Sequence, residues 1–166
     1  TGGQILQGRV AWADAVVDGT AWNLRSIYAP SDSSQREKKT FIRALMAATS
    51  PNIEADPTEK LIDARSIVGG DFNCVASESA DIRRIKPLAT KKTDVAGKLL
   101  ESSFAARGLT DTWRNQKGPR AFSSTWEKDG TQKRLDRYYI AKMPGRKASV
   151  AKDATYHTKT SGARSD

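Results

Sequence analysis

Apolar and polar residues alternate along the first part of the chain in the manner of paired strands. Val10, Trp12 and Val16 share one parity, and residues 20–29 repeat the alternation after the dipeptide Asp18-Gly19. Because Asp-Gly tolerates the positive φ angles of a tight turn, the pattern predicts a β-hairpin over about residues 9–29.

A helical period follows Pro30, which ends the second strand. We expect Ser31 or Asp32 to cap this helix, which should run to about residue 48, because either side chain can accept a hydrogen bond from a free first-turn amide. One face carries an apolar stripe formed by Phe41, Ile42, Leu45 and Met46. Residues 49–60 contain two prolines among polar residues and predict a loop.

A second helix is predicted from Thr93 or Asp94 to about residue 107, with Gly108 as its C-terminal stop. Its expected inward-facing residues are Val95, Leu99, Leu100 and Phe104. Before this helix, Ile67-Val68 reads as a short strand, and Gly69-Gly70 is expected to let the backbone turn sharply.

The remaining segments are short and extended. Residues 83–92 hold paired basic residues and predict an exposed loop, whereas residues 109–113, 122–126 and 134–140 predict strands, and residues 147–156 a weak last strand. This order of elements predicts an α/β fold, with helices layered on a central sheet.

Composition narrows the class of protein. The chain has 166 residues, 37% of them hydrophobic, a single cysteine and no apolar run long enough to span a membrane. The formal charge is +9, of which +8 lies between Arg114 and Asp166, where 13 basic residues face 5 acidic ones. Such a surplus favours a polyanionic partner. From charge alone, however, a basic surface that only aids solubility explains it equally well.

Four short segments place polar residues at strand ends, where open α/β sheets gather functional groups. These segments are residues 27–30, 69–73, 134–138 and the terminal 165–166. In this order and spacing they resemble the second half of the endonuclease/exonuclease/phosphatase superfamily, which includes apurinic endonucleases and pancreatic-type deoxyribonuclease.

Within that superfamily the chain resembles the endonuclease domain of non-LTR (LINE-type) retrotransposons, through residues 69–75, 108–114, 122–126 and 134–136. The resemblance covers about residues 9–166. It implies a partial four-layer α/β sandwich of the deoxyribonuclease/AP-endonuclease type, with mixed, mostly antiparallel sheets and flanking helices, lacking the N-terminal part.

The resemblance also implies roles for individual residues. Asp71 would orient or deprotonate the attacking water, Asn73 would bind the phosphate or the attacking oxygen, and Tyr28 would donate its hydroxyl to the phosphoryl group. Asp166 and Asp71 would serve a Mg²⁺ ion, with Mn²⁺ as an alternative. Asp136 would orient a histidine that the family carries directly after Ser-Asp, and the general base stays unassigned.

The residues themselves support part of this assignment. If the strand continues, Asp71 and Asn73 leave the same face, with Phe72 turned into the core. A carboxylate and an amide oxygen suit a hard cation. Asp136, however, has a second interpretation, because it stands in Arg134-Leu135-Asp136-Arg137 and can pair with a neighbouring arginine.

DNA is the partner that the resemblance implies, with contacts expected from Arg114, Trp126 and Arg134. Aromatic residues at strand ends are also common in cores and rims, and we favour that interpretation for most of Trp113, Phe122 and Trp126.

The family pattern also contains residues that this sequence lacks. An N-terminal Asn and Glu that hold the metal, and the final His, have no counterpart, since His157 comes too early. We therefore expect residues 1–166 to be an incomplete domain, inactive and poorly stable alone, cut from a polyprotein with a reverse transcriptase region. The expected location is intracellular, nuclear by analogy, with no membrane contact. A non-catalytic nucleic-acid-binding remnant and a phosphatase or other phosphodiesterase of the superfamily are the alternatives.

Overall fold

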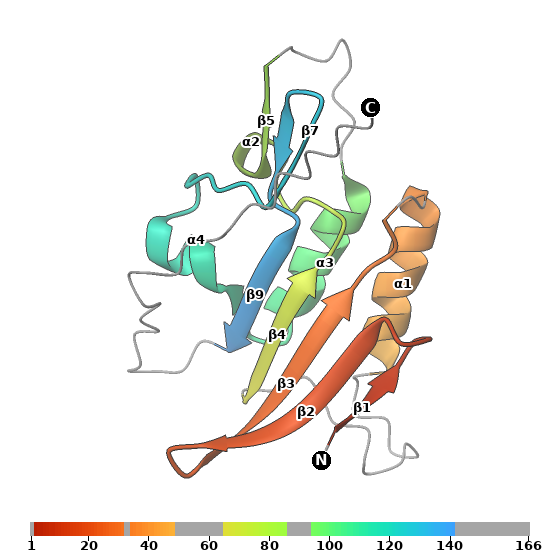
Figure 1. The fold of residues 1–166 in the computed structure, drawn as a ribbon, viewed down its shortest axis with the longest axis vertical. Coiled ribbons are helices and arrows are strands. Elements are labelled where there is room, and N and C mark those ends of the chain that lie inside the picture. The colour runs from red at the N-terminus through yellow and green to blue at the C-terminus, as the bar shows by residue number, and fades with distance from the viewer. Residues whose placement is uncertain (1, 32–33, 49–64, 86–93, 142–166) are drawn as a thin grey trace, which may run out of the picture.

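The computed structural model describes residues 2–31, 34–48, 65–85 and 94–141. Its strands form a six-stranded sheet in the order β1-β2-β3-β4-β9-β6 and a three-stranded sheet in the order β5-β8-β7 (Figure 1). In the six-stranded sheet only β3 and β4 run parallel. The mixed, mostly antiparallel α/β class predicted from the sequence is confirmed.

The elements have the following bounds. The strands of the large sheet are β1 (Gly2–Ile5), β2 (Val10–Val17), β3 (Thr20–Tyr28), β4 (Ser66–Asp71), β6 (Leu109–Asp111) and β9 (Asp136–Ala141). Those of the small sheet are β5 (Ile82–Arg84), β7 (Trp126–Lys128) and β8 (Thr131–Lys133). The helices are α1 (Gln35–Ala47), α2 (Glu78–Asp81), α3 (Val95–Ala105) and α4 (Thr112–Lys117).

The predicted hairpin is confirmed. Strand β2 pairs with β3 from Val10 opposite Ile27 to Val17 opposite Thr20, and Asp18 and Gly19 turn with φ angles of 49° and 71°. The register of the whole hairpin therefore follows from one dipeptide.

The predicted cap of α1 is wrong by a few residues. Ser34, not Ser31 or Asp32, begins the helix, because its hydroxyl accepts from the amide of Glu37 while the Glu37 carboxylate accepts from the amide of Ser34. This reciprocal pair satisfies two groups that would otherwise lack partners at the helix start. For α3, the predicted cap Asp94 is confirmed, whereas the helix ends at Ala105, two residues earlier than predicted, and Gly108 follows with a φ of 72°.

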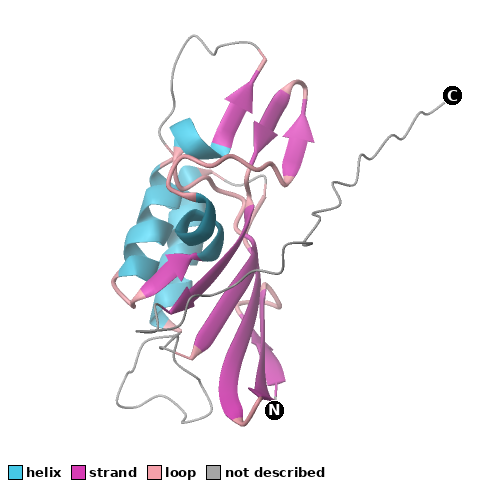
Figure 2. Ribbon diagram, turned by 90° about the vertical axis from the view of Figure 1, so that its left-hand side faces the viewer, coloured by secondary structure: helices cyan, strands magenta, loops and turns pink. Residues whose placement is uncertain are grey.

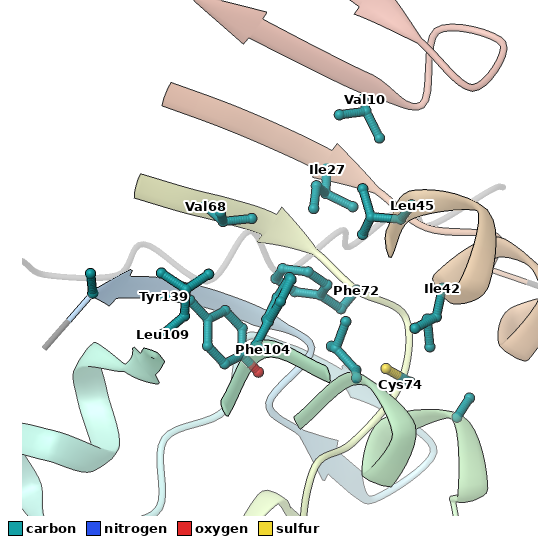
Figure 3. Close-up of a cluster of buried hydrophobic side chains, with 13 residues drawn as sticks. Val10, Ile27, Ile42, Leu45, Val68, Phe72, Cys74, Phe104, Leu109 and Tyr139 are labelled. Carbon is teal, nitrogen blue, oxygen red and sulfur yellow. The ribbon is translucent and has the colours of Figure 1, made fainter. Parts of the chain in front are cut away.

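Helices α1 and α3 cover one face of the large sheet (Figures 1 and 2). Between them and the sheet lies a core in which the rings of Phe72, Phe104 and Tyr139 meet edge to face, at centroid distances of 4.6–5.9 Å (Figure 3). Leu100 is buried as predicted, but Val95 is 47% exposed because it occupies the first position of α3 and faces away from the sheet.

The glycine pair does not turn the chain. Strand β4 continues through Gly69 and Gly70 to Asp71. A side chain at Gly70 would place its Cβ 2.0 Å from the Ile27 carbonyl oxygen, and one at Gly69 would meet the ring of Tyr138 at 2.4 Å. The glycines therefore allow close approach within the sheet, and the space above them is already used by the protein.

Two regions carry more structure than the pattern suggested. Residues 82–84 form β5 instead of an exposed loop, and residues 112–117 form α4 after a short β6. A second hairpin, β7–β8, turns at Asp129-Gly130. These strands have three residues each, which is too few for a period-2 pattern to be visible.

Candidate functional site

The candidate site is a row of three side chains across neighbouring strands. Tyr28, the last residue of β3, pairs with Asp71, the last residue of β4, and Asp71 pairs with Asp136, the first residue of β9. Directly paired residues project from the same face of a sheet with Cβ atoms about 5 Å apart. The register thus gathers a phenol and two carboxylates at one end of the sheet.

This row lies on the face opposite the helices. Its neighbours on the helix-covered face, Ile27 and Arg137, are buried, whereas Tyr28 is 54% exposed and both carboxyl residues are partly exposed. We call Tyr28, Asp71 and Asp136 the phenol–carboxylate row.

Asn73 approaches this row by a different route from the one predicted. The strand ends at Asp71, and Asn73 has a φ of 46°, so the extended geometry that would put both side chains on one face does not persist. Instead the Asn73 amide donates to Oδ1 of Asp71 at 2.8 Å, and its side-chain Nδ2 donates to the carbonyl of Ala29 at 2.7 Å. Asn73 therefore ties the ends of β3 and β4 together. Phe72 points into the core, as predicted.

The environment of Asp71 disfavours its negative charge. Burial raises the pKa of its carboxyl above the ordinary value, and the neighbouring Asp136 carboxylate adds to that rise. The Asn73 hydrogen bond and the charges of Arg137 and Lys38 act in the opposite direction but do not cancel it. Two adjacent carboxylates with one raised pKa are typical of a proton-transfer or cation-binding site.

Two basic residues near the row were missed by the sequence analysis. Arg9 places its guanidinium 5.9 Å from the centroid of the Tyr28 ring and donates to the Tyr28 carbonyl. Lys38, in the first turn of α1, donates through Nζ to the carbonyl of Asn73 at 2.6 Å. The hairpin register could have revealed Arg9, which lies one pair beyond Val10–Ile27, but no pattern marks Lys38.

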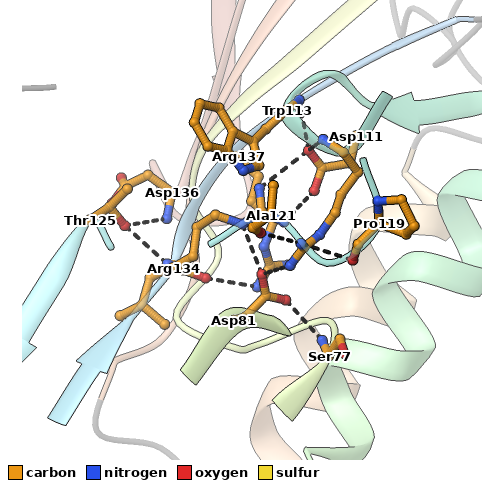
Figure 4. Close-up of polar contacts among 12 residues, drawn as sticks. Ser77, Asp81, Asp111, Trp113, Pro119, Ala121, Thr125, Arg134, Asp136 and Arg137 are labelled. Atoms are coloured by element: carbon orange, nitrogen blue, oxygen red, sulfur yellow. Dashed lines mark hydrogen bonds and ion pairs between the residues drawn. The ribbon is translucent and has the colours of Figure 1, made fainter. Parts of the chain in front are cut away.

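Asp136 is positioned through its backbone. The hydroxyl of Thr125 accepts hydrogen bonds from the amides of Leu135 and Asp136, both at 3.0 Å (Figure 4). The alternative that Asp136 pairs with a neighbouring arginine is not what the structure shows, because both flanking arginines bind elsewhere. Arg137 donates to the carbonyl of Cys74 and lies 3.9 Å from Glu101.

Arg134 belongs to a buried ion-pair network instead of a DNA-binding surface. It is 2% exposed, and it pairs with Asp81 through Nε at 2.8 Å and with Asp111 through both terminal nitrogens (Figure 4). Arg114 also pairs with Asp81 and donates to the carbonyls of Pro119 and Ala121. The predicted contact of Arg134 with nucleic acid is therefore corrected, because its donors join α2 and β6 inside the protein. The contact of Arg114 stays a prediction.

The network also sets the charge of Asp81. Burial alone would raise the pKa of this carboxyl, but the charge and hydrogen bonds of Arg134, with the Ser77 amide, hold it below the ordinary value. Trp126, the third predicted DNA-binding residue, is partly exposed, with the Lys133 ammonium 4.7 Å from its ring centroid.

The described residues supply only part of the predicted metal site. Asp166, Ser165 and His157 lie outside them, and within them no group of three or more His, Cys, Asp or Glu side chains could hold a metal. Asp71 and Asp136 still fit a Mg²⁺ ion that keeps most of its waters, because such ions bind through one or two carboxylates. No described helix is long and apolar enough to cross a membrane.

Comparisons with known proteins agree on the fold. No protein-family model matches the chain. The endonuclease domain of TRAS1, a telomere-specific non-LTR retrotransposon, aligns with a TM-score of 0.51 and 16% identity, over 85% of this chain and 54% of that one. The 3′ phosphatase NExo from Neisseria, solved with a product DNA hairpin, gives a TM-score of 0.52 and 16% identity, over 81% and 52%.

The chain has the endonuclease/exonuclease/phosphatase fold. It spans about half of the length of these solved relatives. A further similarity is to an uncharacterised 149 kDa protein of transposon TX1 from Xenopus laevis, 31% identical over 140 residues, which make up 82% of this chain and 10% of that protein. The predicted resemblance to retrotransposon endonucleases is thereby confirmed, and the fold is one shared by phosphate-ester hydrolases.

Proposed function

We propose that this chain forms the carboxyl-side part of a divalent-metal-dependent DNA endonuclease that hydrolyses one phosphodiester bond of a transposon target. The observation that carries the proposal is the register that places Tyr28, Asp71 and Asp136 side by side at one end of the sheet. The fold comparisons and the transposon relative support the reaction class and the biological setting.

The residues act on a phosphate placed against the exposed side of the phenol–carboxylate row. The Tyr28 hydroxyl donates to a non-bridging phosphoryl oxygen, where negative charge grows during attack. Asp71 orients the attacking water and accepts its proton. Asn73 keeps the ends of β3 and β4 in register through its bonds to Asp71 and Ala29, and leaves its side-chain oxygen for the water.

Asp71 and Asp136 would hold a divalent cation, which would balance their adjacent negative charges. When bound, such an ion supplies Lewis-acid stabilisation of the phosphoryl oxygens. Asp166 remains a proposed third carboxylate. Mn²⁺ would serve in place of Mg²⁺, since both prefer oxygen ligands.

The wider setting is part of the same proposal. A nicked DNA end suits extension by a reverse transcriptase region of the same polyprotein, and such a reaction takes place in the nucleus. The small share of the transposon relative that this chain covers supports a larger parent protein.

A nicking assay tests the proposal. Supercoiled plasmid is incubated with Mg²⁺ and either this chain or a longer polypeptide that adds the sequence encoded on both sides. We expect nicking by the longer polypeptide, its loss in Asp71→Asn, and full retention in Asp18→Asn, which makes the same chemical change at an exposed turn. If neither polypeptide nicks the plasmid in Mg²⁺ or in Mn²⁺ but DNA binding is retained, the alternative of a non-catalytic nucleic-acid-binding protein is favoured instead.

A further inference from the structure

Three basic side chains come from elements at the end of the molecule that holds the phenol–carboxylate row. Lys38 comes from the first turn of α1, Lys133 from β8 and Arg84 from β5, and all three are partly buried. The beginning of α1 and the small sheet lie at the same end of the molecule as the ends of β3 and β4 (Figure 1). The pairing of β5 with β8 also puts Arg84 and Lys133 on the same face of the small sheet. We call Lys38, Lys133 and Arg84 the basic trio.

The members of the trio repel one another. Burial lowers the pKa of the Lys133 ammonium, and the charges of Lys38 and Arg84 lower it further. Asp94 acts in the opposite sense, yet its two oxygens already accept from the amides of Gly97 and Val75, both at 2.9 Å. Repulsion among these like charges costs free energy, which a bound anion would offset.

The trio also lies next to the candidate catalytic groups. Lys38 Nζ is 2.6 Å from the carbonyl of Asn73, and its charge acts on the pKa of Asp71. Arg84 also lines a cavity of about 380 Å³ whose polar lining includes Lys98, two serines and the carboxyl residues Glu78 and Asp94. Two basic residues thus lie along the loop that follows β4, although they share this cavity with two acidic ones.

Aromatic rings accompany the basic groups. Lys133 lies over Trp126 with its Nζ 4.7 Å from the ring centroid, and Arg83, beside Arg84, lies 4.2 Å from the centroid of Phe122. Alternating cations and aromatic faces suit a nucleic acid, whose phosphates and bases alternate, better than they suit an acidic peptide.

We propose that Lys38, Lys133 and Arg84 form a second phosphate site, which binds the backbone of a nucleic acid strand beside the phosphate held at the phenol–carboxylate row. The inference rests on the proposed function for its ligand, a nucleic acid. The inference adds a path for the bound strand. The strand would run from the phenol–carboxylate row over the loop between β4 and α2 and continue toward Lys98.

The test measures binding without catalysis. Anisotropy of a fluorescent duplex oligonucleotide, in EDTA and over a series of NaCl concentrations, gives the slope of log K against log[salt]. Each of Lys38→Gln, Lys133→Gln and Arg84→Gln should reduce that slope by about 0.9, because each removes one phosphate contact. Arg43→Gln, an exposed change of equal charge on α1, should leave it unchanged.

Two further arms keep the result decisive. Lys38→Arg and Lys133→Arg retain the charge and should retain the slope, which a folding defect would not do. The inference is overturned if the three Gln variants have the same slope as Arg43→Gln. It is also overturned if the wild-type chain binds no oligonucleotide, or binds polyglutamate equally well. Binding with the predicted slopes but no nicking keeps the second site and contradicts the proposed hydrolysis, whereas nicking with unaltered slopes does the reverse.

Discussion

Asp71 and Asp81 are both carboxyl residues, the first at the end of β4 and the second at the end of α2. Their surroundings differ. Asp81 is fully buried, bonded to two arginines, and has a lowered pKa. Asp71 is partly exposed, lies beside another carboxylate, and has a raised pKa. We infer that the ion-pair network stabilises the fold. The adjacent carboxylates of the phenol–carboxylate row, in contrast, repel each other and do not stabilise it.

The largest effect on stability is expected at Asp81. Replacing it in Asp81→Asn removes the negative partner of Arg114 and leaves buried Arg134 with Asp111 alone, which should lower the free energy of unfolding by about 3–5 kcal/mol. Urea denaturation followed by circular dichroism measures this, with Asp18→Asn as the control. A loss below about 1 kcal/mol, as for an exposed ion pair, would show that the network does not support the fold.

The largest effect on chemistry is expected at Asp71. In the polypeptide that nicks plasmid, Asp71→Asn should slow nicking by about 100-fold or more, the range seen when one group that acts on the transition state is removed. Stability at neutral pH should not fall, because the amide oxygen can still accept from Asn73 and the repulsion from Asp136 is gone. A variant that nicks normally, or that unfolds as readily as Asp81→Asn, would contradict the assignment.

Much of this comparison was visible in the sequence, and part of it was not. The Asp18-Gly19 turn fixes the β2–β3 register, and the apolar run before Asp71 predicts β4. The candidate residues Tyr28, Asp71 and Asp136, by contrast, were named from the family resemblance. Their pairing could not be derived from pattern alone, because it depends on contacts between strands far apart along the chain.

The wrong prediction for Arg134 has a similar cause. Arg134 lies in a segment that the family resemblance marks as functional, and basic residues are usually exposed, so a contact with DNA was the natural expectation. Its partners Asp81 and Asp111 come from elements that were not predicted or were only partly predicted, α2 and β6. Burial of a charge depends on such partners, and a single-sequence pattern does not contain them.

The phenol of the row should matter for chemistry but little for folding. Tyr28→Phe removes only a hydroxyl from a side chain that is 54% exposed, so unfolding should change by less than about 0.5 kcal/mol. Nicking should slow by about 10- to 100-fold if the hydroxyl donates to the phosphoryl oxygen. Tyr138→Phe, on the same exposed face, is the matched control, and equal rates for the two variants would remove Tyr28 from the site.

The contributions of Asp71 and Asp81 to stability should change in opposite directions with pH. A raised folded-state pKa at Asp71 means that the folded chain binds more protons, so its contribution to stability decreases as pH rises through the ordinary aspartate range. A lowered pKa at Asp81 contributes stability above that range, which is lost on acidification. We therefore expect the free energy of unfolding of Asp71→Asn, minus that of the wild type, to rise between pH 3 and 7. The same difference for Asp81→Asn should fall over this range. Changes of equal sign in the two variants would contradict the account.

The most direct measurement of the central claim is where a divalent ion binds this chain. In an amide NMR spectrum titrated with paramagnetic Mn²⁺, the signals of Tyr28, Asp71 and Asp136 should broaden first, and Asp71→Asn should abolish that broadening. Broadening centred on other carboxylates, such as Glu78 or Asp129, or broadening that persists in Asp71→Asn, would show that the phenol–carboxylate row is not the site.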